Sequence, residues 1–271
     1  MSVPVEPKDV PSLELRDVTK TLGSTDVLKN FDLKLYGGQI VVLLGANGAG
    51  KTTLLHLMGS LYQPNDGQVL LDGKPLCRSR LDQRRRLHYL PDIPTISPAQ
   101  SPLEYIAFVL QCYECFQDGD SAVERKVIEL LKEFELLTLS DSPSRTLSRG
   151  QKYKATLVAL LAVDPDIWIL DEPFTSGMDP LGLTLLRRHM EKARLRNRLI
   201  VYSTQLVEVA KQLSDTVCIL ADSKLAALGP IHSLEDNADS TPGLRELLGQ
   251  LREITTPADS DANESGNLDQ G

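Results

Sequence analysis

The segment "GANGAGKTT" at residues 45–53 carries the residue types that bind a phosphate chain. Its glycines let the backbone wrap around phosphate, so that successive N–H groups and the N-terminus of the next helix face the negative charge. Lys51 supplies a cation for the β- and γ-phosphates, and the Thr52 hydroxyl can ligate Mg²⁺. Because the apolar run "QIVVLL" precedes the segment and the helical pattern "TTLLHLMGSL" follows it, the sequence favours a phosphate-binding loop (P-loop) over a chance glycine-rich turn.

Two neighbouring carboxylates, Asp171 and Glu172, directly follow the apolar run "IWIL". In open α/β sheets, ligands bind at the edge formed by the carboxyl ends of the strands. One carboxylate can hold Mg²⁺ through water while its neighbour polarises an attacking water. Their place after a buried strand therefore favours a catalytic pair over two ordinary surface acids.

A second candidate anion-binding segment is "LSRGQ" at residues 147–151, which ends 20 residues before Asp171. It opens an apolar-rich helical pattern, so the Ser148 hydroxyl and the Gly150 amide are expected at a helix N-terminus. The free N–H groups and the positive dipole end at such a terminus accept anions.

In this order and spacing, the P-loop, "LSRGQ", "IWILDEP" and "SGMDP" resemble the ATP-binding cassette (ABC) ATPases over roughly residues 12–235. Kinases and GTPases have P-loops but no such signature. The resemblance implies that two cassettes pair head to tail, with each ATP lying between the P-loop of one and the signature of the other. It assigns the binding of phosphates and Mg²⁺ to Gly45, Asn47, Gly48, Gly50, Lys51, Thr52 and Thr53.

The same resemblance implies roles for the acidic pair and the signature. Asp171 supports the metal, and Glu172 acts as the catalytic base. Asp179, in "SGMDP", belongs to the loop that lets the two sites communicate. Arg149 stands where the family often has glycine, and its side chain is expected to point outwards. The residues that reach the γ-phosphate of the partner cassette are Ser148, Gly150 and Gln151.

Three positions depart from the family pattern. Leu22 takes the place of the aromatic residue that stacks on adenine, which predicts a lower affinity for the base. Asp92 takes the place of the glutamine that joins ATP to the helical insert; it is still an oxygen ligand for the metal, but it is charged. An acid here resembles an exporter-type branch of the family. Gln205, 33 residues after Glu172, takes the place of the histidine that senses the γ-phosphate.

The amide of Gln205 can donate an N–H to a phosphate oxygen and accept from water, but it cannot carry a proton or a positive charge. Loss of a charge-assisted contact in the transition state typically costs about 2 to 4 kcal/mol. We therefore expect ATP binding to persist while turnover slows. The alternative is that Gln205 is an ordinary loop residue, one or two positions away from the functional place.

The expected elements position these residues in an α/β fold. The first 75 residues mix alternating runs with turn signals at Asp66-Gly67 and Asp72-Gly73, which predicts antiparallel strands. The continuous apolar runs "QIVVLL", "IWIL" and "LIVY", separated by helical patterns, predict a parallel sheet covered on both faces. Three helical patterns begin at residues 102, 121 and 147. The fold class is thus a P-loop NTPase core with a mixed or parallel sheet, an N-terminal antiparallel β subdomain and a helical insert.

The predicted organisation has five parts. A flexible N-terminus at 1–11 precedes the ATPase domain at 12–235, which contains the helical subdomain at about 92–163. A helical extension follows at 236–255. The last segment, 256–271, has four acids and no basic residue, which predicts a disordered tail.

Composition narrows the classes of partner. The net charge of −8 disfavours a protein that binds nucleic acid by broad phosphate neutralisation. No apolar run reaches the roughly 18 residues that a membrane helix needs, and the N-terminus lacks the features of a secretory signal, which favours the cytosol. Cys112 and Cys115 form a C-x-x-C without a second ligand pair, which favours reduced thiols on a packed helix over zinc. The basic run at 78–88 favours a solvated helix face over a lipid or partner site.

These observations favour an ATP-hydrolysing subunit of an ABC transporter. We expect it to lie at the inner face of the membrane, held there by an integral membrane permease subunit, and to pair with a second cassette as a homodimer or heterodimer. The apolar helix near 102–116 is expected to contribute to the docking face. Two alternatives stay open: a soluble ABC protein in translation, DNA repair or iron–sulfur assembly, and a degenerate cassette that binds ATP as a regulatory clamp.

Overall fold

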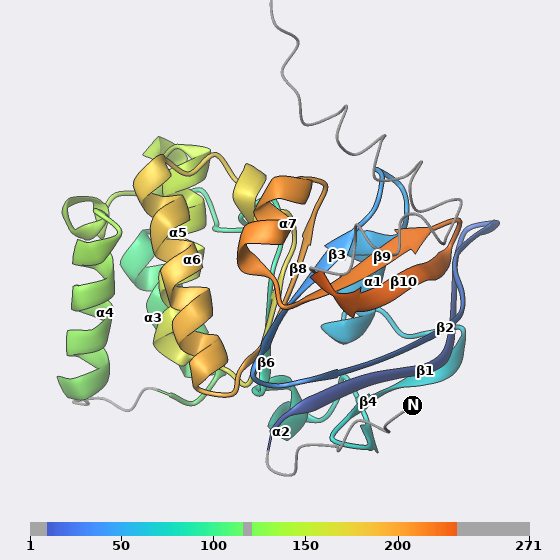
Figure 1. Cartoon of the computed structure of the whole chain (residues 1–271). Helices are drawn as coiled ribbons and strands as arrows, with labels where there is room; N and C mark the ends of the chain where they lie inside the picture. Colours follow the sequence, from blue (N-terminus) through green and yellow to red (C-terminus); the bar gives the residue numbers. More distant parts are fainter. Residues whose placement is uncertain (1–9, 116–120, 232–271) are drawn as a thin grey trace, which may run out of the picture.

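Two sheets and a set of helices make up residues 10–115 and 121–231, the part of the chain that the computed structural model describes (Figure 1). Helices α3 to α6 gather on one side of the molecule, and the antiparallel strands lie on the other. The predicted helical extension at 236–255 and acidic tail at 256–271 lie outside the described residues, as does most of the predicted flexible N-terminus.

The antiparallel subdomain is a sheet of order β2-β1-β4-β5. Asp72-Gly73 is the turn between its last two strands, as predicted, but Asp66-Gly67 lies inside a strand. Gly67 has φ +76°, and a Cβ there would lie 2.1 Å from the Asp17 carbonyl oxygen, so a close backbone approach explains this glycine. The strands are β1 (Ser12–Leu22), β2 (Thr25–Tyr36), β4 (Asp66–Leu71) and β5 (Lys74–Pro75).

The central sheet has the order β10-β9-β3-β8-β7-β6, and only β10 runs antiparallel to its neighbour. This confirms the predicted mixed sheet. Along β3, Ile40 and Val42 pack with the helices, whereas Val41 and Leu43 pack with α1 and the antiparallel strands. Burial of both faces explains the continuous apolar runs. The strands are β3 (Gln39–Leu44), β6 (Leu87–Leu90), β7 (Ile167–Leu170), β8 (Leu199–Thr204), β9 (Thr216–Ala221) and β10 (Lys224–Pro230).

The helical insert contains the three helices that the sequence predicts. Helix α5 packs against α3 and α4, and its residues Tyr153 to Ala162 are buried. The helices of the described chain are α1 (Lys51–Met58), α2 (Leu81–Arg84), α3 (Pro102–Cys112), α4 (Ser121–Glu133), α5 (Arg149–Val163), α6 (Pro180–Leu195) and α7 (Val207–Leu213). None of these helices combines the length and apolar character that crossing a bilayer requires. Cys112 ends α3 and is exposed, whereas Cys115 lies beyond the helix and is partly buried.

The basic run at 78–88 is not the single solvated helix face that the sequence predicts. Only Leu81–Arg84 is helical, and residues 87 and 88 begin β6. Arg86 instead donates from Nη1 to Asp72 at 2.5 Å and from Nε to Asp166 at 2.7 Å. The prediction was wrong because the partners of Arg86 come from turns that are distant in sequence.

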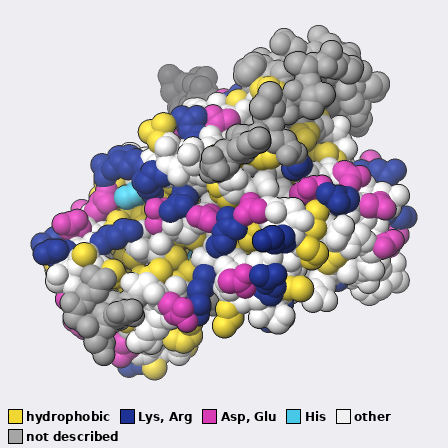
Figure 2. Space-filling model, turned by 90° about the horizontal axis from the view of Figure 1, so that it is seen from below, with side chains coloured by type: hydrophobic (Ala, Val, Ile, Leu, Met, Phe, Trp, Pro, Cys, Tyr) yellow, Lys and Arg dark blue, Asp and Glu magenta, His cyan; other side chains and the backbone are white. Residues whose placement is uncertain are grey.

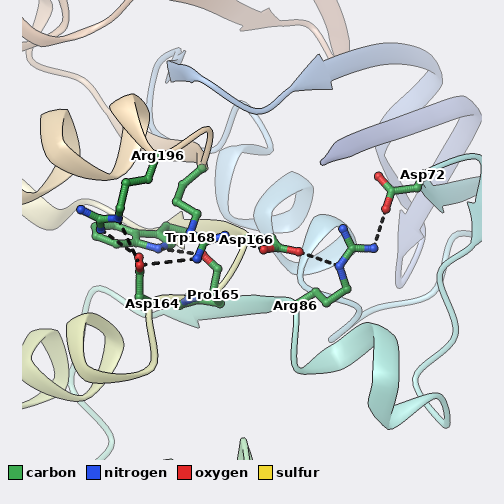
Figure 3. A network of polar contacts seen from close by, with 8 residues as sticks. Asp72, Arg86, Asp164, Pro165, Asp166, Trp168 and Arg196 are labelled. Atoms are coloured by element: carbon green, nitrogen blue, oxygen red, sulfur yellow. Dashed lines mark hydrogen bonds and ion pairs between the residues drawn. The ribbon is translucent and has the colours of Figure 1, made fainter. Parts of the chain in front are cut away.

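Arg86 belongs to a series of six side chains of alternating charge that are joined by ion pairs; Figure 3 shows this charge chain from close by. Asp166 lies between Arg86 and Arg198, and Asp164 lies between Arg198 and Arg196. The chain joins the β4–β5 turn to the segments just before β6, β7 and β8, so it ties the antiparallel sheet to the amino-terminal edge of the central sheet. Its members, in order, are Asp72, Arg86, Asp166, Arg198, Asp164 and Arg196.

Candidate functional site

The P-loop joins β3 to α1. Gly48 and Gly50 have φ values of +82° and +98°, a left-handed conformation that side chains other than glycine rarely adopt. Gly45 is needed for a different reason, because a Cβ there would lie 2.7 Å from the Leu220 carbonyl oxygen. Gly50 is the residue before α1, so the loop ends at the N-terminus of that helix. Asn47 lies at the exposed part of the loop.

Lys51 is the cation of the loop and is buried, with 7% of its surface exposed. Its Nζ donates to the carbonyl oxygens of Gly45 at 2.8 Å and Ala46 at 3.1 Å. Burial lowers the pKa of Lys51, and the nearby carboxylates of Glu172 and Asp171 oppose that shift. Next to Lys51, Thr52 is exposed and Thr53 is buried.

The acidic pair lies at the carboxyl end of β7, as predicted. Asp171 is buried, and its carboxylate accepts hydrogen bonds from the Ser203 hydroxyl at 2.6 Å and the Tyr89 hydroxyl at 3.3 Å. Glu172 Oε1 lies 4.0 Å from Lys51 Nζ. Burial raises the pKa of Glu172, with Lys51 opposing the shift. A carboxylate with a raised pKa is a stronger base than an exposed one, which suits proton abstraction.

Gln205 lies at the same edge of the sheet. It follows Thr204, the register partner of Leu44, which places it beside the start of the P-loop. Gln205 Oε1 and Glu172 Oε2 are both buried and have no hydrogen-bond partner among the described residues. Buried polar atoms are normally paired. Two unpaired acceptor atoms fit a hydrogen-bond donor such as a water molecule, whereas the ammonium group of Lys51, 4.0 Å from Glu172, fits an anion such as phosphate.

The signature segment forms the N-terminus of α5. Ser148 Oγ accepts from the Gln151 backbone N–H at 3.1 Å, and Gln151 Oε1 accepts from the Ser148 N–H at 2.9 Å. This reciprocal capping box occupies both side chains locally. Gly150 packs so tightly that a Cβ would lie 2.2 Å from the Gly177 carbonyl oxygen. The signature therefore lies against the "SGMDP" loop of its own chain.

Asp179 caps the N-terminus of α6. Its Oδ1 accepts from the Gly182 N–H at 2.8 Å, and its Oδ2 lies 2.6 Å from Lys154 Nζ. The hydrogen bond with Lys154 lowers the pKa of Asp179. Because Lys154 belongs to α5, this ion pair joins the helix of the signature to the "SGMDP" loop.

The structure adds detail at two further positions. Arg149 was expected to point outwards; half of its surface is exposed, but its guanidinium forms an ion pair with Asp92. Leu22 ends β1 and is 41% exposed. Sequence reasoning missed Ser203 and Tyr89 as partners of Asp171. The polar triplet "STQ" at 203–205 was a signal for Ser203, whereas nothing local distinguishes Tyr89.

The fold and motifs agree with those of known proteins. A family model described as "ABC transporter" matches residues 28–175. Nod factor export ATP-binding protein I from Cupriavidus pinatubonensis is 32% identical over 90% of this chain and 75% of its own length. The ABC-type transporter ATP-binding protein EcsA from Bacillus subtilis is 29% identical over 83% of this chain and 89% of its own.

Solved structures are similar over most of the chain. An ATP-binding subunit of an ABC transporter superposes with a TM-score of 0.79 and 26% identity, covering 89% of this chain and 99% of that one. A dimeric ATP-binding cassette bound to ADP and Pi shares the fold, with a TM-score of 0.72 and 23% identity over 81% of this chain and 98% of that one.

Proposed function

This chain belongs to the ABC transporter family, and on that premise we propose that it binds and hydrolyses ATP to power substrate movement through separate membrane subunits. The observation that carries the proposal is the grouping of Lys51, Glu172 and Gln205 at one edge of the sheet. There a buried ammonium lies 4.0 Å from a carboxylate, and two buried oxygen atoms have no partner among the described residues.

The site offers N–H donors that fit the phosphates of ATP and oxygen ligands that fit Mg²⁺. Lys51 would contact the β- and γ-phosphates, and the backbone N–H groups of the P-loop would surround them. The Thr52 hydroxyl and the Asp171 carboxylate would hold Mg²⁺, with Asp92 as a further oxygen ligand. When bound, Mg²⁺ would neutralise the negative charge that develops on the phosphates. The remaining P-loop contacts would come from Gly45, Asn47, Gly48, Gly50 and Thr53.

Glu172 would accept the proton of the attacking water. Its raised pKa and its place beside Lys51 support that role. The Gln205 amide would orient the water without supplying charge, which predicts slow turnover. Ser148, Gly150 and Gln151 of this chain would reach the γ-phosphate bound by the partner cassette, while Asp179 would connect the two sites.

A substitution at Glu172 tests hydrolysis. Glu172→Gln keeps the shape of the side chain but removes the base, so we expect steady-state ATP hydrolysis to fall at least a hundredfold while ATP affinity stays within a few fold. Phosphate release and binding of a fluorescent ATP analogue give the two measurements. Glu129→Gln, an exposed substitution on α4, is the control. Equal rates for Glu172→Gln and the native chain would refute hydrolysis at this site.

A hydrophobic surface supports a membrane subunit as partner. Seen from below, hydrophobic side chains gather between charged ones over the helical part of the molecule (Figure 2). A groove of about 380 Å³ lies between α3 and α4. Its lining is almost entirely apolar: Leu103, Ile106, Ala107, Leu110, Val123, Val127 and Ile128, with Glu124 as the one charged member. We propose that the permease subunit docks on this face, which would hold the chain at the inner face of the membrane.

Charge substitutions test the docking. Leu103 lines the groove and is 41% exposed, so Leu103→Glu leaves the core intact. Losing the burial of one leucine at an interface costs about 1.5–3 kcal/mol, so recovery on membranes that contain the permease should fall about tenfold or more. Leu195→Glu, at a leucine that is 77% exposed at the end of α6, is the matched control. Equal recovery of both variants would exclude this docking face and favour a soluble ABC protein.

A regulatory cassette with little hydrolysis is the second candidate. The exposed Leu22 and the uncharged Gln205 favour it, because both weaken functions that an active cassette needs. Tight ATP binding by the native chain together with hydrolysis no faster than that of Glu172→Gln would favour the regulatory function over the motor function.

A further inference from the structure

Asp171 is held from both sides by hydroxyl groups of neighbouring strands. Its strand, β7, lies between β6 and β8 in the sheet. Tyr89 of β6 donates to Asp171 Oδ2 at 3.3 Å, and Ser203 of β8 donates to Oδ1 at 2.6 Å. Each carboxylate oxygen therefore has one hydrogen-bond donor within the described part of the chain. Since a carboxylate oxygen offers two lone pairs, each also keeps acceptor capacity for a further ligand.

His56 of the P-loop helix stands behind Tyr89. Its Nε2 lies 3.0 Å from the Tyr89 hydroxyl oxygen. The tyrosine has a single hydroxyl proton, which goes to the acceptor-only carboxylate, so His56 must be the donor and carry its proton on Nε2. The imidazole is packed edge-on against the rings of Tyr62 and Tyr89, with centroid distances of 4.7 and 5.1 Å. A relay of two hydrogen bonds thus runs from α1 through β6 to Asp171.

We propose that Tyr89, supported by His56, is a positioning residue that fixes the carboxylate of Asp171 for a divalent cation. The inference rests on the proposed function, in which Asp171 supports Mg²⁺. Ser203 anchors one oxygen and also accepts the Glu172 backbone N–H at 2.9 Å, so β8 positions both acids. Tyr89 anchors the other oxygen, and through His56 it links the orientation of this carboxylate to the helix that follows the P-loop.

The relay explains two polar side chains, Tyr89 and His56, that the proposed hydrolysis does not otherwise use. Tyr89 lies on a mostly buried strand, and its hydroxyl points toward Asp171 in the site. His56 lies on the helix that carries Lys51 and Thr52, the residues proposed to contact phosphate and metal. A movement of α1 when nucleotide binds would therefore be transmitted to Asp171 through His56 and Tyr89.

The test measures cation binding apart from hydrolysis. Mn²⁺, observed by electron paramagnetic resonance in the presence of ADP, is the probe. Removing a partner of a metal-supporting carboxylate typically weakens metal affinity 10- to 100-fold, so Tyr89→Phe should weaken Mn²⁺ binding about tenfold. ADP affinity in the presence of a chelator should stay within twofold, because no hydrogen bond of the relay reaches the P-loop backbone.

Two further variants separate positioning from a general loss of structure. Tyr113→Phe removes a hydroxyl that donates to the Leu87 carbonyl at the start of the same strand, 2.7 Å away, and should leave Mn²⁺ affinity unchanged. His56→Ala should weaken Mn²⁺ binding less than Tyr89→Phe. The double variant should equal Tyr89→Phe alone, because His56 acts through the tyrosine hydroxyl.

Asp171→Asn is the reference variant that distinguishes failure of the inference about Tyr89 from failure of the proposed function. If Asp171→Asn loses Mn²⁺ binding while Tyr89→Phe binds as the native chain does, Tyr89 is not a positioning residue and the proposed function stands. If Asp171→Asn also binds Mn²⁺ normally, Asp171 does not support the metal, and both the inference and that part of the proposed function are overturned. Additive losses in the double variant would contradict the relay through His56.

Discussion

At the scale of single residues, the site holds an ammonium group and two carboxylates, with a neutral amide at the same edge of the sheet. Lys51 and Glu172 lie 4.0 Å apart, and burial shifts the pKa of both in the direction that favours the neutral form. Each group opposes the shift of the other, so each helps the other to stay charged. Gln205 follows β8 at the same edge of the sheet and carries only a neutral amide.

Restoring a histidine at position 205 should increase turnover. An imidazole can share a proton and carry positive charge, which an amide cannot. Since a charge-assisted contact in the transition state is worth about 2 to 4 kcal/mol, Gln205→His should raise kcat at least tenfold, with KM for ATP changing little. Steady-state phosphate release measures both constants. Gln205→Asn, which keeps an amide, is the control, and unchanged or lower turnover in Gln205→His would mean that no histidine role was vacant.

At the scale of elements, polar side chains at the ends of helices join parts that the sequence separates. The capping box of Ser148 and Gln151 begins α5, and Asp179 begins α6 while pairing with Lys154 of α5. Arg149, in the first turn of α5, pairs with Asp92 just after β6. Asp92, one of the three expected departures from the family pattern, and Arg149, which stands where the family often has glycine, are thus partners. This pair connects the helical insert to the central sheet.

The energy of the Arg149–Asp92 pair should be small. Both side chains are partly exposed, at 49% and 41%, and such pairs contribute about 0.2–1 kcal/mol. A double-mutant cycle with Arg149→Ala and Asp92→Asn, measured by urea unfolding, should give a coupling of this size that decreases in high salt. Lys152→Ala, on the same helix but without Asp92 as partner, provides the comparison. A coupling of zero at low salt would show that the contact contributes nothing to the free energy of unfolding.

At the scale of the whole molecule, the carboxyl ends and the amino ends of the strands in the central sheet carry different groups of residues. The carboxyl edge carries the P-loop, the acidic pair and Gln205. The opposite edge carries the chain of alternating charges from Asp72 to Arg196, which connects both sheets (Figure 3). Trp168 of β7 lies beside this chain, and its indole N–H donates to the Pro165 carbonyl at 3.2 Å. The ion pairs that connect the two sheets and the residues proposed to act on ATP therefore lie at opposite ends of the strands.

Breaking the charge chain at its centre should destabilise the molecule without affecting nucleotide binding. Asp166 pairs with Arg86 and Arg198 at 2.7 Å each and is 29% exposed, so Asp166→Asn should lower the free energy of unfolding by about 1–3 kcal/mol. The protein has a single tryptophan, Trp168, and its fluorescence reports unfolding of this region. Asp82→Asn removes an exposed pair with Arg80 and should change stability little. Equal stability of the two variants would mean that the alternating charges do not act as a network.

Local sequence was sufficient to predict the P-loop, the acidic pair after β7 and the signature at the start of α5. Each of these depends on a few adjacent residues: glycines that permit positive φ, an apolar run that becomes a buried strand, and a serine that caps a helix. The same logic predicted the mixed sheet and the three helices of the insert. It failed for Asp66-Gly67 and for the basic run at 78–88, where contacts with distant segments outweigh local preference.

Only the tertiary structure decided which side chains surround the proposed site. Tyr89 and Ser203 are 82 and 32 residues away from Asp171 in the sequence, and they meet its carboxylate because β7 lies between β6 and β8. The sequence likewise did not predict that Arg149 pairs with Asp92, 57 residues away. It also did not predict the ion pairs of the charge chain. Sequence spacing specifies local backbone conformation, whereas the order of strands in a sheet depends on long-range packing. That order brings the side chains of β6, β7 and β8 together.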